Sequence, residues 1–256
     1  MASIIEAVED IFQDGSALVK FAVYAAPIFL NYHLYMTKNP LYWPLNILIS
    51  IIMLGFTTEC VSNARNGKEK VMPGYNIFKL FWHGIKALIA MLPYIIAFGA
   101  AAFFAFEYVL KNIITVNAAG ITWIIITVLF TYGIATAAVM TAYFLYARRF
   151  RILDAYNLKT LSDAFGDVFV GLILFIIKMA LLNVVIIGSV TYLFVLFTGM
   201  TNNYDVLQNL YLIFADLTKN NLYLYFLSMM AVFQAAITGD YYAQLSYEAI
   251  EVKENN

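Results

Sequence analysis

The chain has 256 residues, of which 63% are hydrophobic and only 12% are charged, and its mean hydropathy is +0.78. This composition excludes an ordinary water-soluble globular domain and predicts a polytopic membrane protein. The net charge of -1 provides no basic surface for nucleic acid, and the single cysteine, Cys60, excludes an intrachain disulfide.

The first residues predict a short amphipathic helix. Ile4, Val8 and Ile11 fall on one face at helical spacing, whereas acidic residues occupy the other face. Ser3 and Glu6 have the spacing of a capping box, in which the two side chains satisfy backbone N–H groups of the first turn. A signal peptide would begin with positive residues before an apolar core, so we expect this segment to remain in the mature protein.

Six stretches are predicted to span the membrane, because each is mostly apolar over roughly the 20 residues that a bilayer requires. They cover residues 17–36, 43–62, 86–110, 119–147, 168–198 and 221–246. The first stretch contains Lys20, Pro27 and His33, so a re-entrant segment is the alternative there.

Two further amphipathic helices are predicted directly before the third and the fifth span. In residues 77–88 apolar side chains recur at helical spacing, while Lys79 and His83 share the opposite face. Residues 158–168 repeat this arrangement. Such helices are expected to lie in the membrane interface.

Each amphipathic helix precedes two spans, so the chain predicts three units within one polytopic domain: residues 3–62, 76–147 and 157–246. Asn76 and Asn157 stand at the N-cap positions of the second and third units. Because two spans return the chain to the side it left, all three amphipathic helices would share one side. The predicted fold class is an all-α membrane protein with six transmembrane helices in three helical hairpins, each preceded by a cytoplasmic-side amphipathic interfacial helix.

The positions of lysine and arginine predict the orientation. With both termini in the cytoplasm, eleven of the 15 basic residues fall inside, three fall outside, and Lys178 lies within a span. The inner residues are Lys20, Arg65, Lys68, Lys70, Lys79, Lys86, Arg148, Arg149, Arg151, Lys159 and Lys253, and the outer ones are Lys38, Lys111 and Lys219. Because basic residues favour the cytoplasmic side, we expect both termini there.

Small residues recur every four positions in the third and fourth spans, which favours close contact between two helix backbones. They are Ala97, Ala101 and Ala105 in the third span and Gly133, Ala137 and Thr141 in the fourth. We therefore expect these two spans to pack against each other.

Three runs of the sequence share a pattern with a known family. In GFTTECVSNARNGKEKVMPGYNIFKLFWHGIKALIAMLPYII, a glycine-aromatic pair, a basic residue, a loop proline and a helix with a glycine follow one another. These positions are filled by Gly55, Arg65, Pro73, Phe81, Gly84 and Tyr94. The other runs are YARRFRILDAYNLKTLSDAF and TGDYYAQLSYEAI. Together the runs resemble the domain of unknown function 4013 family, which comprises uncharacterised prokaryotic multi-pass membrane proteins.

The resemblance covers about residues 3–250 and implies a location in the prokaryotic cytoplasmic (inner) membrane. Residues 72–75 depart from the proline, acidic residue and aromatic residue that the family usually has in its first loop. The family has no established activity, so the resemblance implies architecture and no catalytic residue.

The sequence contains no pattern for catalysis or for a metal. Cys60, His33 and His83 lie on separate segments, so we predict no metal site. The chain also lacks a nucleophile motif and a phosphate-binding loop, so we predict that it is not an enzyme and needs no cofactor.

The informative residues are the polar ones inside spans, because a charge in hydrocarbon costs at least ~2.5 kcal/mol unless it finds water or a partner. Lys178 and Asp240 lie at similar depths in the fifth and sixth spans, so one hypothesis is an ion pair between them. Gln234 and Asn183 would extend this pair into a polar track. The alternative is simple polar contact between helices, or a lysine that reaches the interface alone.

Two charged contacts are expected nearer the cytoplasmic face. Glu59 is predicted to lie at the level of the lipid headgroups near Arg65. The acidic first helix is expected to meet the arginine cluster of Arg148, Arg149 and Arg151, which would tie the first unit to the third.

Two functions follow from this organisation. The first is a non-enzymatic scaffold or accessory protein that organises the lipid bilayer, anionic lipids in particular, or docks a membrane-protein partner or a second copy at the cytoplasmic face. The candidate contacts are Arg65, Lys68, Lys70, Lys79, Lys86, Arg148, Arg149 and Arg151. The alternative is a small-solute or proton-coupled transporter or channel whose polar path passes Lys178 and Asp240.

Overall fold

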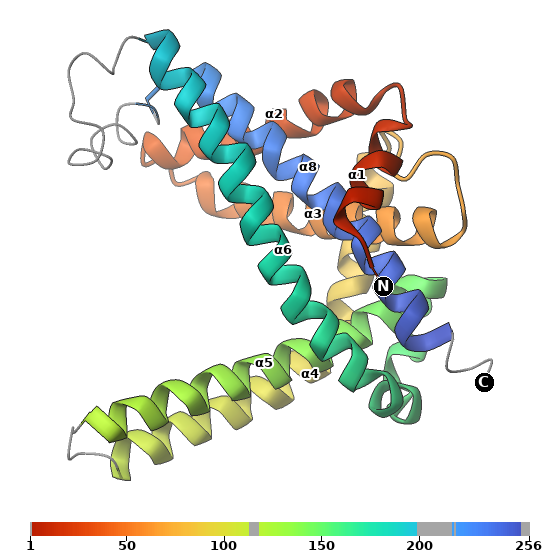
Figure 1. Cartoon of the computed structure of the whole chain (residues 1–256), viewed down its shortest axis with the longest axis vertical. Helices are drawn as coiled ribbons and strands as arrows, with labels where there is room; N and C mark the ends of the chain where they lie inside the picture. The colour runs from red at the N-terminus through yellow and green to blue at the C-terminus, as the bar shows by residue number, and fades with distance from the viewer. Residues whose placement is uncertain (1, 113–117, 199–216, 218, 252–256) are drawn as a thin grey trace.

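The computed structural model describes residues 2–112, 118–198, 217 and 219–251, and every regular element in them is helical (Figure 1). The α-helices are α1 (Ile4–Phe12), α2 (Ala17–Met36), α3 (Tyr42–Arg65), α4 (Ile77–Asn112), α5 (Ala118–Arg149), α6 (Leu158–Thr198) and α8 (Asn221–Ser246). Two short helices complete the set, the 3-10 helix η1 (Ile152–Tyr156) and the π-helix η3 (Tyr247–Glu251).

Five helical stretches are long and apolar enough to cross a membrane, so the protein is an all-α membrane protein. They are Ala17–Met36, Tyr42–Arg65, Ile77–Ala101, Leu158–Phe197 and Asn221–Ile250. The first continues as helix through Pro27, which favours a complete span over a re-entrant segment. The predicted span 119–147 falls in α5, where the side chains up to residue 131 lie outside the described ones, so a sixth span stays a prediction.

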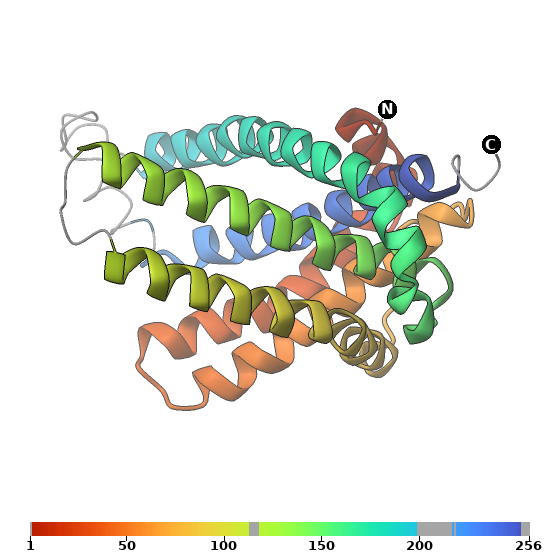
Figure 2. The same ribbon diagram turned by 90° about the horizontal axis from the view of Figure 1, so that it is seen from below.

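The connections between helices gather at two ends of the molecule (Figure 2). One end, called the terminal end below, holds residues 2–16, 66–76, 150–157 and 247–251. The opposite end, called the hairpin end, holds the turn at residues 37–41 between α2 and α3. Within the molecule, α3 contacts α2, α4, α5 and α8. α8 contacts α1, α2, α3, α5, α6 and η3, so α3 and α8 together position most of the other elements.

Of the three predicted amphipathic segments, α1 is a separate helix, whereas the other two are the beginnings of longer helices. Residues 77–88 form the first turns of α4, which runs for 36 residues, and residues 158–168 begin α6, which runs for 41. Neither junction contains a turn sequence that would end a helix. Figure 2 nevertheless shows that the first turns of α4 run in a different direction from the rest of that helix.

The change of direction in α4 accompanies Pro93. A proline inside a helix has no N–H, so the carbonyl four residues earlier, that of Ile89, loses its usual donor. The Tyr156 hydroxyl of η1 donates to this carbonyl oxygen at 3.1 Å, and the Tyr94 hydroxyl of α4 donates to the Ala155 carbonyl oxygen at 2.7 Å. The two bonds dock η1 beside the proline.

Glycines allow α3 to approach its neighbours closely. A Cβ added to Gly55 of α3 would lie 1.7 Å from the carbonyl oxygen of Leu80, and one added to Gly84 of α4 would lie 2.0 Å from that of Ile51. Gly239 of α8 approaches α3 in the same way. Two of these glycines, Gly55 and Gly84, are positions that carry the family resemblance.

α4 and α5 contact each other as expected, but two of the three predicted alanines of α4 are exposed. These are Ala97 and Ala101, and the side chain of Ala105 lies outside the described ones. In α5, the added Cβ of Gly133 would lie 3.2 Å from the ring of Phe169 on α6. The spacing of four identifies a face made of small residues, but it does not show which helix that face meets.

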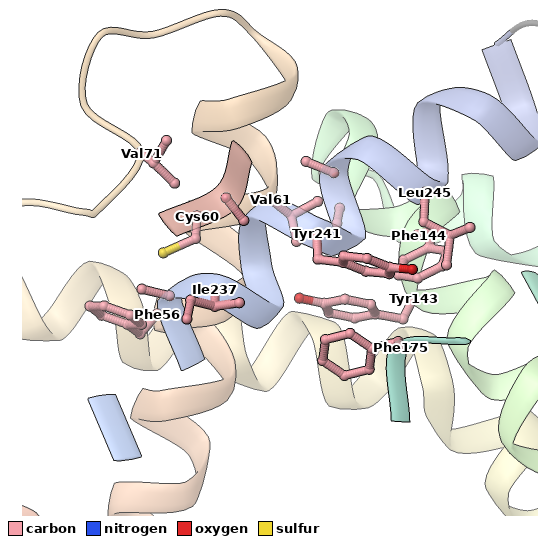
Figure 3. Packing of buried hydrophobic residues seen from close by; sticks show 14 of the residues in the cluster. Phe56, Cys60, Val61, Val71, Tyr143, Phe144, Phe175, Ile237, Tyr241 and Leu245 are labelled. Carbon is pink, nitrogen blue, oxygen red and sulfur yellow. The ribbon is translucent and has the colours of Figure 1, made fainter. Parts of the chain in front are cut away.

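Aromatic side chains fill the core where α3, α5, α6 and α8 meet (Figure 3). Tyr143 of α5, Phe175 of α6 and Tyr241 of α8 lie together in this view. The ring centroids of Phe175 and Tyr241 are 4.9 Å apart, and the Tyr143 hydroxyl lies 3.2 Å from Oγ1 of Thr58 on α3 and donates to it. A buried tyrosine usually finds such a partner. These contacts join four helices next to the terminal end.

Candidate functional site at the terminal end

Lys178 and Asp240 have different partners, so the predicted ion pair between them is not formed in the described residues. Lys178 Nζ donates to the carbonyl oxygen of Ala2 at 2.8 Å and lies 5.3 Å from the ring centroid of Tyr241. Asp240 is 1% exposed and accepts a hydrogen bond from Nε2 of Gln244 at 2.8 Å. The lysine therefore anchors the N-terminal segment instead of neutralising Asp240.

Gln244 completes a polar connection between α8 and the beginning of the chain. Its Oε1 accepts from the Ser3 N–H at 2.6 Å, and its Nε2 donates to the Ser3 carbonyl oxygen at 3.4 Å. These bonds hold α1 against α8, with Ile4, Ala7 and Ile11 buried. Sequence reasoning missed this connection because Gln244 binds backbone atoms of Ser3, and every residue has such atoms. The one signal in the sequence was the helical spacing of the apolar residues of α1, which indicated that this face would pack against something.

The predicted contact between the acidic face of α1 and the arginine cluster is not formed by Arg149 or Arg151. In the described residues, no ion pair joins Glu6, Glu9 or Asp10 to either of them. The apolar face of α1, packed on α8, fixes its position instead.

Asp14, between α1 and α2, has a fully buried carboxylate. Nζ of Lys20 donates to it at 2.7 Å, and Ser16 donates from its N–H at 3.0 Å and from its hydroxyl at 2.6 Å. Nζ of Lys70 lies 3.9 Å away. Burial alone would raise the pKa of Asp14, but the hydrogen bonds from Lys20 and Ser16 outweigh burial and lower this pKa to about 2.

The loop of residues 66–76 is bound to α2 through backbone oxygens. Lys20 Nζ donates to the Met72 carbonyl oxygen at 3.1 Å, and the Tyr24 hydroxyl donates to that of Gly74 at 2.6 Å. Met72 itself is only 2% exposed. The loop is therefore part of the packed structure at the terminal end.

Glu59 was predicted at the level of the lipid headgroups near Arg65, but it is buried in α3 and pairs with two residues of α4. Lys79 Nζ donates to Oε1 of Glu59, and Nδ1 of His83 lies 3.0 Å from its Oε2. The α3–α4 crossing at the two glycines brings the first turns of α4 directly beside Glu59.

This contact changes what the polar face of the first turns of α4 meets. The sequence places Lys79 and His83 on a water-facing side, and both contact Glu59, although the Lys79 side chain keeps 49% of its surface exposed. Phe78 is instead 79% exposed and Trp82 50% exposed, with Lys86 Nζ 5.9 Å from the Trp82 ring centroid. Exposed aromatic residues beside a lysine are typical of the membrane interface.

Most basic residues near the loop have protein partners. Lys68 Nζ donates to Oδ1 of Asn63 at 2.8 Å, and Lys70 lies beside Asp14. Arg65 is half-buried in the last turn of α3. The lysines of this group therefore help to fasten the loop.

Arg148 and Arg149 line a cavity of about 200 Å³ at the N-terminal end of α6. Asp154, Asn157 and Thr160 also line it. Oδ1 of Asn157 accepts from the Thr160 N–H at 3.3 Å, which confirms the predicted N-cap. Two guanidinium groups and the positive end of a helix favour an anion, whereas the carboxylate of Asp154 opposes one. We call this space the arginine cavity.

Gln234 and Asn183 do contact each other, inside the membrane-spanning parts of α8 and α6. Nε2 of Gln234 donates to Oδ1 of Asn183 at 2.5 Å. Such a bond joins two helices at a depth where water is scarce.

Comparison of the chain with protein-family models, with curated proteins and with solved structures found no match. The family resemblance therefore stays a prediction.

Proposed function

We propose that the protein is a non-enzymatic scaffold of the prokaryotic inner membrane that binds anionic lipid headgroups at its terminal end. It has six transmembrane helices in three hairpins, and both of its termini are cytoplasmic, so the terminal end meets the inner leaflet. The lysine and arginine distribution supports this orientation, and anionic lipids attract basic residues at that surface.

The arginine cavity is the observation that carries the proposal. Arg148 and Arg149 come from the last turn of α5, and they lie beside the first turn of α6. Arg151, two residues beyond α5, is exposed. A phosphate-containing headgroup matches this combination of planar guanidinium donors and backbone N–H groups at a helix start.

Exposed leucines beside the arginines support a bilayer as the partner. Leu153, which lines the arginine cavity, is 80% exposed, and Leu158 at the start of α6 is 69% exposed. Basic residues next to protruding apolar side chains are typical of a surface that lies in the headgroup region, where the leucines enter the acyl boundary.

The buried contacts at the terminal end support a scaffold in preference to a transporter. A transporter path would require Lys178 and Asp240, but Lys178 binds the Ala2 carbonyl oxygen and Asp240 binds Gln244, which in turn binds Ser3. Only the contact between Gln234 and Asn183 favours the transporter alternative. Proton flux into liposomes that Asp240→Asn abolishes would support that alternative.

The proposal is tested by adding phosphatidylglycerol to the purified protein and measuring the rise in its unfolding temperature. The double variant Arg148→Gln/Arg149→Gln should bind this lipid about 30-fold more weakly, because each basic residue at the surface contributes ~1 kcal/mol. Lys38→Gln, at the hairpin end, is the control and should leave binding unchanged.

Phosphatidylcholine and inorganic phosphate are the comparison ligands. They show whether the rise in unfolding temperature comes from the lipid's negative charge, from lipid in general or from phosphate alone. Phosphatidylglycerol alone should stabilise the wild type strongly. Equal stabilisation by phosphatidylcholine would contradict recognition of charge, and equal stabilisation by inorganic phosphate would show a site for a soluble anion instead of a lipid.

A further inference from the structure

A second cavity lies at the hairpin end, between α2, α3 and α8. It has a volume of about 400 Å³, and apolar and aromatic side chains form most of its wall. The residues that matter below are Asn31, Tyr32, Tyr35, Tyr42, Asn46 and Ser228. None of the residues that line it carries a charge at neutral pH. The size is within the range of ligand-binding pockets, ~300–1,000 Å³.

Asn31, which lines the cavity, has a side-chain polar atom that no protein group described by the structure satisfies. Asn31 is 8% exposed, and its Nδ2 donates to Oδ1 of Asn46 at 3.0 Å. The Oδ1 of Asn31 is buried, and no donor lies within hydrogen-bonding distance of it in the described residues. A buried acceptor without a donor is costly, so Asn31 is suited to a molecule that brings a donor.

The same conclusion holds for either orientation of the two amides. If both amides are rotated, Asn46 becomes the donor, and the NH₂ group of Asn31 takes the place of its oxygen as the group without a partner. A hydroxyl group can donate to the oxygen or accept from the NH₂ group. It is therefore the small neutral group that satisfies Asn31 in both cases.

The remaining walls specify the rest of the ligand. Tyr35 and Tyr42 have ring centroids 5.0 Å apart, and Tyr32 and Tyr35 have centroids 6.3 Å apart, so aromatic faces and edges border the cavity. Ser228 uses its hydroxyl to donate to the Leu224 carbonyl oxygen at 2.9 Å. A charged ligand would find no opposite charge here, and its desolvation would oppose binding.

We propose that this cavity binds the hydroxyl end of an uncharged, lipid-like alcohol, whose O–H pairs with Asn31 while its apolar part lies against the tyrosines. The site is at the opposite end of the molecule from the arginine cavity, and it recognises a neutral ligand where the arginine cavity recognises an anion. The inference does not depend on the scaffold proposal, because its residues belong to α2, α3 and α8 alone.

A photoreactive long-chain alcohol tests the proposal in the full-length protein in nanodiscs. The probe carries a diazirine next to its hydroxyl end, and the comparison probe is the matched alkane without the hydroxyl. After illumination, peptide mass spectrometry locates the labelled residues. The alcohol should label Tyr32, Tyr35 or Tyr42 at least tenfold more than the alkane does.

Two variants and a control complete the test. Asn31→Leu removes the amide at nearly constant volume, and Ala231→Phe fills the cavity while it leaves Asn31 in place; each should reduce labelling by the alcohol at least tenfold. Leu193→Phe adds the same ring on the exposed side of α6 and should change nothing. If Asn31→Leu does not fold, the loss of labelling in Ala231→Phe still shows whether the alcohol binds in the cavity.

Equal labelling by the alcohol and the alkane would overturn the proposal, because it would show an apolar cavity without hydroxyl recognition. Labelling that Ala231→Phe leaves unchanged would also overturn it. A cavity that holds only water would give no labelling of the three tyrosines above that of exposed α6 residues, with the same consequence.

Discussion

Asp14 shows how one carboxylate can join parts of the chain that are distant in sequence. It binds Lys20 of α2, and Lys20 in turn donates to the Met72 carbonyl oxygen in the loop of residues 66–76, between α3 and α4. Because the carboxylate is fully buried and hydrogen-bonded, its ionised form is stabilised in the folded protein. The charge therefore contributes to folding only while it stays ionised.

Asp14→Asn should lower the free energy of unfolding by on the order of 2 kcal/mol at neutral pH. The folded pKa of about 2 lies below the ordinary value of 3.8, so the contribution is present above the ordinary value and is lost as the pH falls towards 2. Chemical unfolding across the acid range measures this. Acid should destabilise the wild type more steeply than the variant, and parallel curves would contradict the assignment.

Asp10→Asn provides the matched control. Burial, followed by the neighbouring charges of Glu6 and Glu9, raises the pKa of Asp10, so its ionised form is disfavoured in the folded protein. Neutralising Asp10 should therefore not destabilise the protein at neutral pH.

At the scale of elements, glycines determine how closely α3 and α4 can cross. Gly55→Ala and Gly84→Ala should each destabilise the protein by ~3 kcal/mol or more, since the added Cβ meets a backbone carbonyl that cannot rotate away. Gly99→Ala, in the same α4, has no atom within 4 Å of the new Cβ and should be neutral or slightly stabilising. Thermal unfolding in one detergent compares the three, and equal effects would contradict the crossing.

The docking of η1 on α4 makes a second prediction at this scale. Tyr156→Phe should cost ~1 kcal/mol, because the Ile89 carbonyl then loses its donor. In a Pro93→Ala background residue 93 supplies its own N–H, so the same change should cost clearly less. A double-mutant cycle measures the difference, and additive effects would show that the tyrosine does not replace the missing bond.

At the scale of the whole molecule, the terminal end and the hairpin end are expected on opposite sides of the membrane. Cys60 is buried, so a Cys60→Ala background permits single cysteines to be introduced at exposed positions. Leu41→Cys should react with an impermeant maleimide in intact cells, and Glu69→Cys only after permeabilisation. Reaction of both from the same side would contradict the proposed topology.

Particular residues show what the sequence could predict. The N-caps at Asn76 and Asn157 were predictable, because each depends on residue type and spacing. Gln234 and Asn183 were recognised as intramembrane polar residues, but only the packing of α6 against α8 shows that they contact each other. Lys178 was recognised as an intramembrane charge, but its partner is a backbone carbonyl. Since every residue has a carbonyl, no sequence pattern indicates which one will accept a bond.

The first turns of α4 illustrate a second limit. Helical periodicity separates the apolar face from the face that contains Lys79 and His83, but it does not show what each face meets. Only the crossing at Gly55 and Gly84 places Glu59 opposite that polar face. A carboxylate on another helix therefore binds two residues that the sequence alone would place in water.

The bonds of Ala2 and Ser3 impose an order on biosynthesis. Ala2 and Ser3 are synthesised well before Lys178 and Gln244, the residues that bind them. The segment that contains α1 must therefore wait at the membrane surface until α6 and α8 are inserted, and only then can α1 dock against α8.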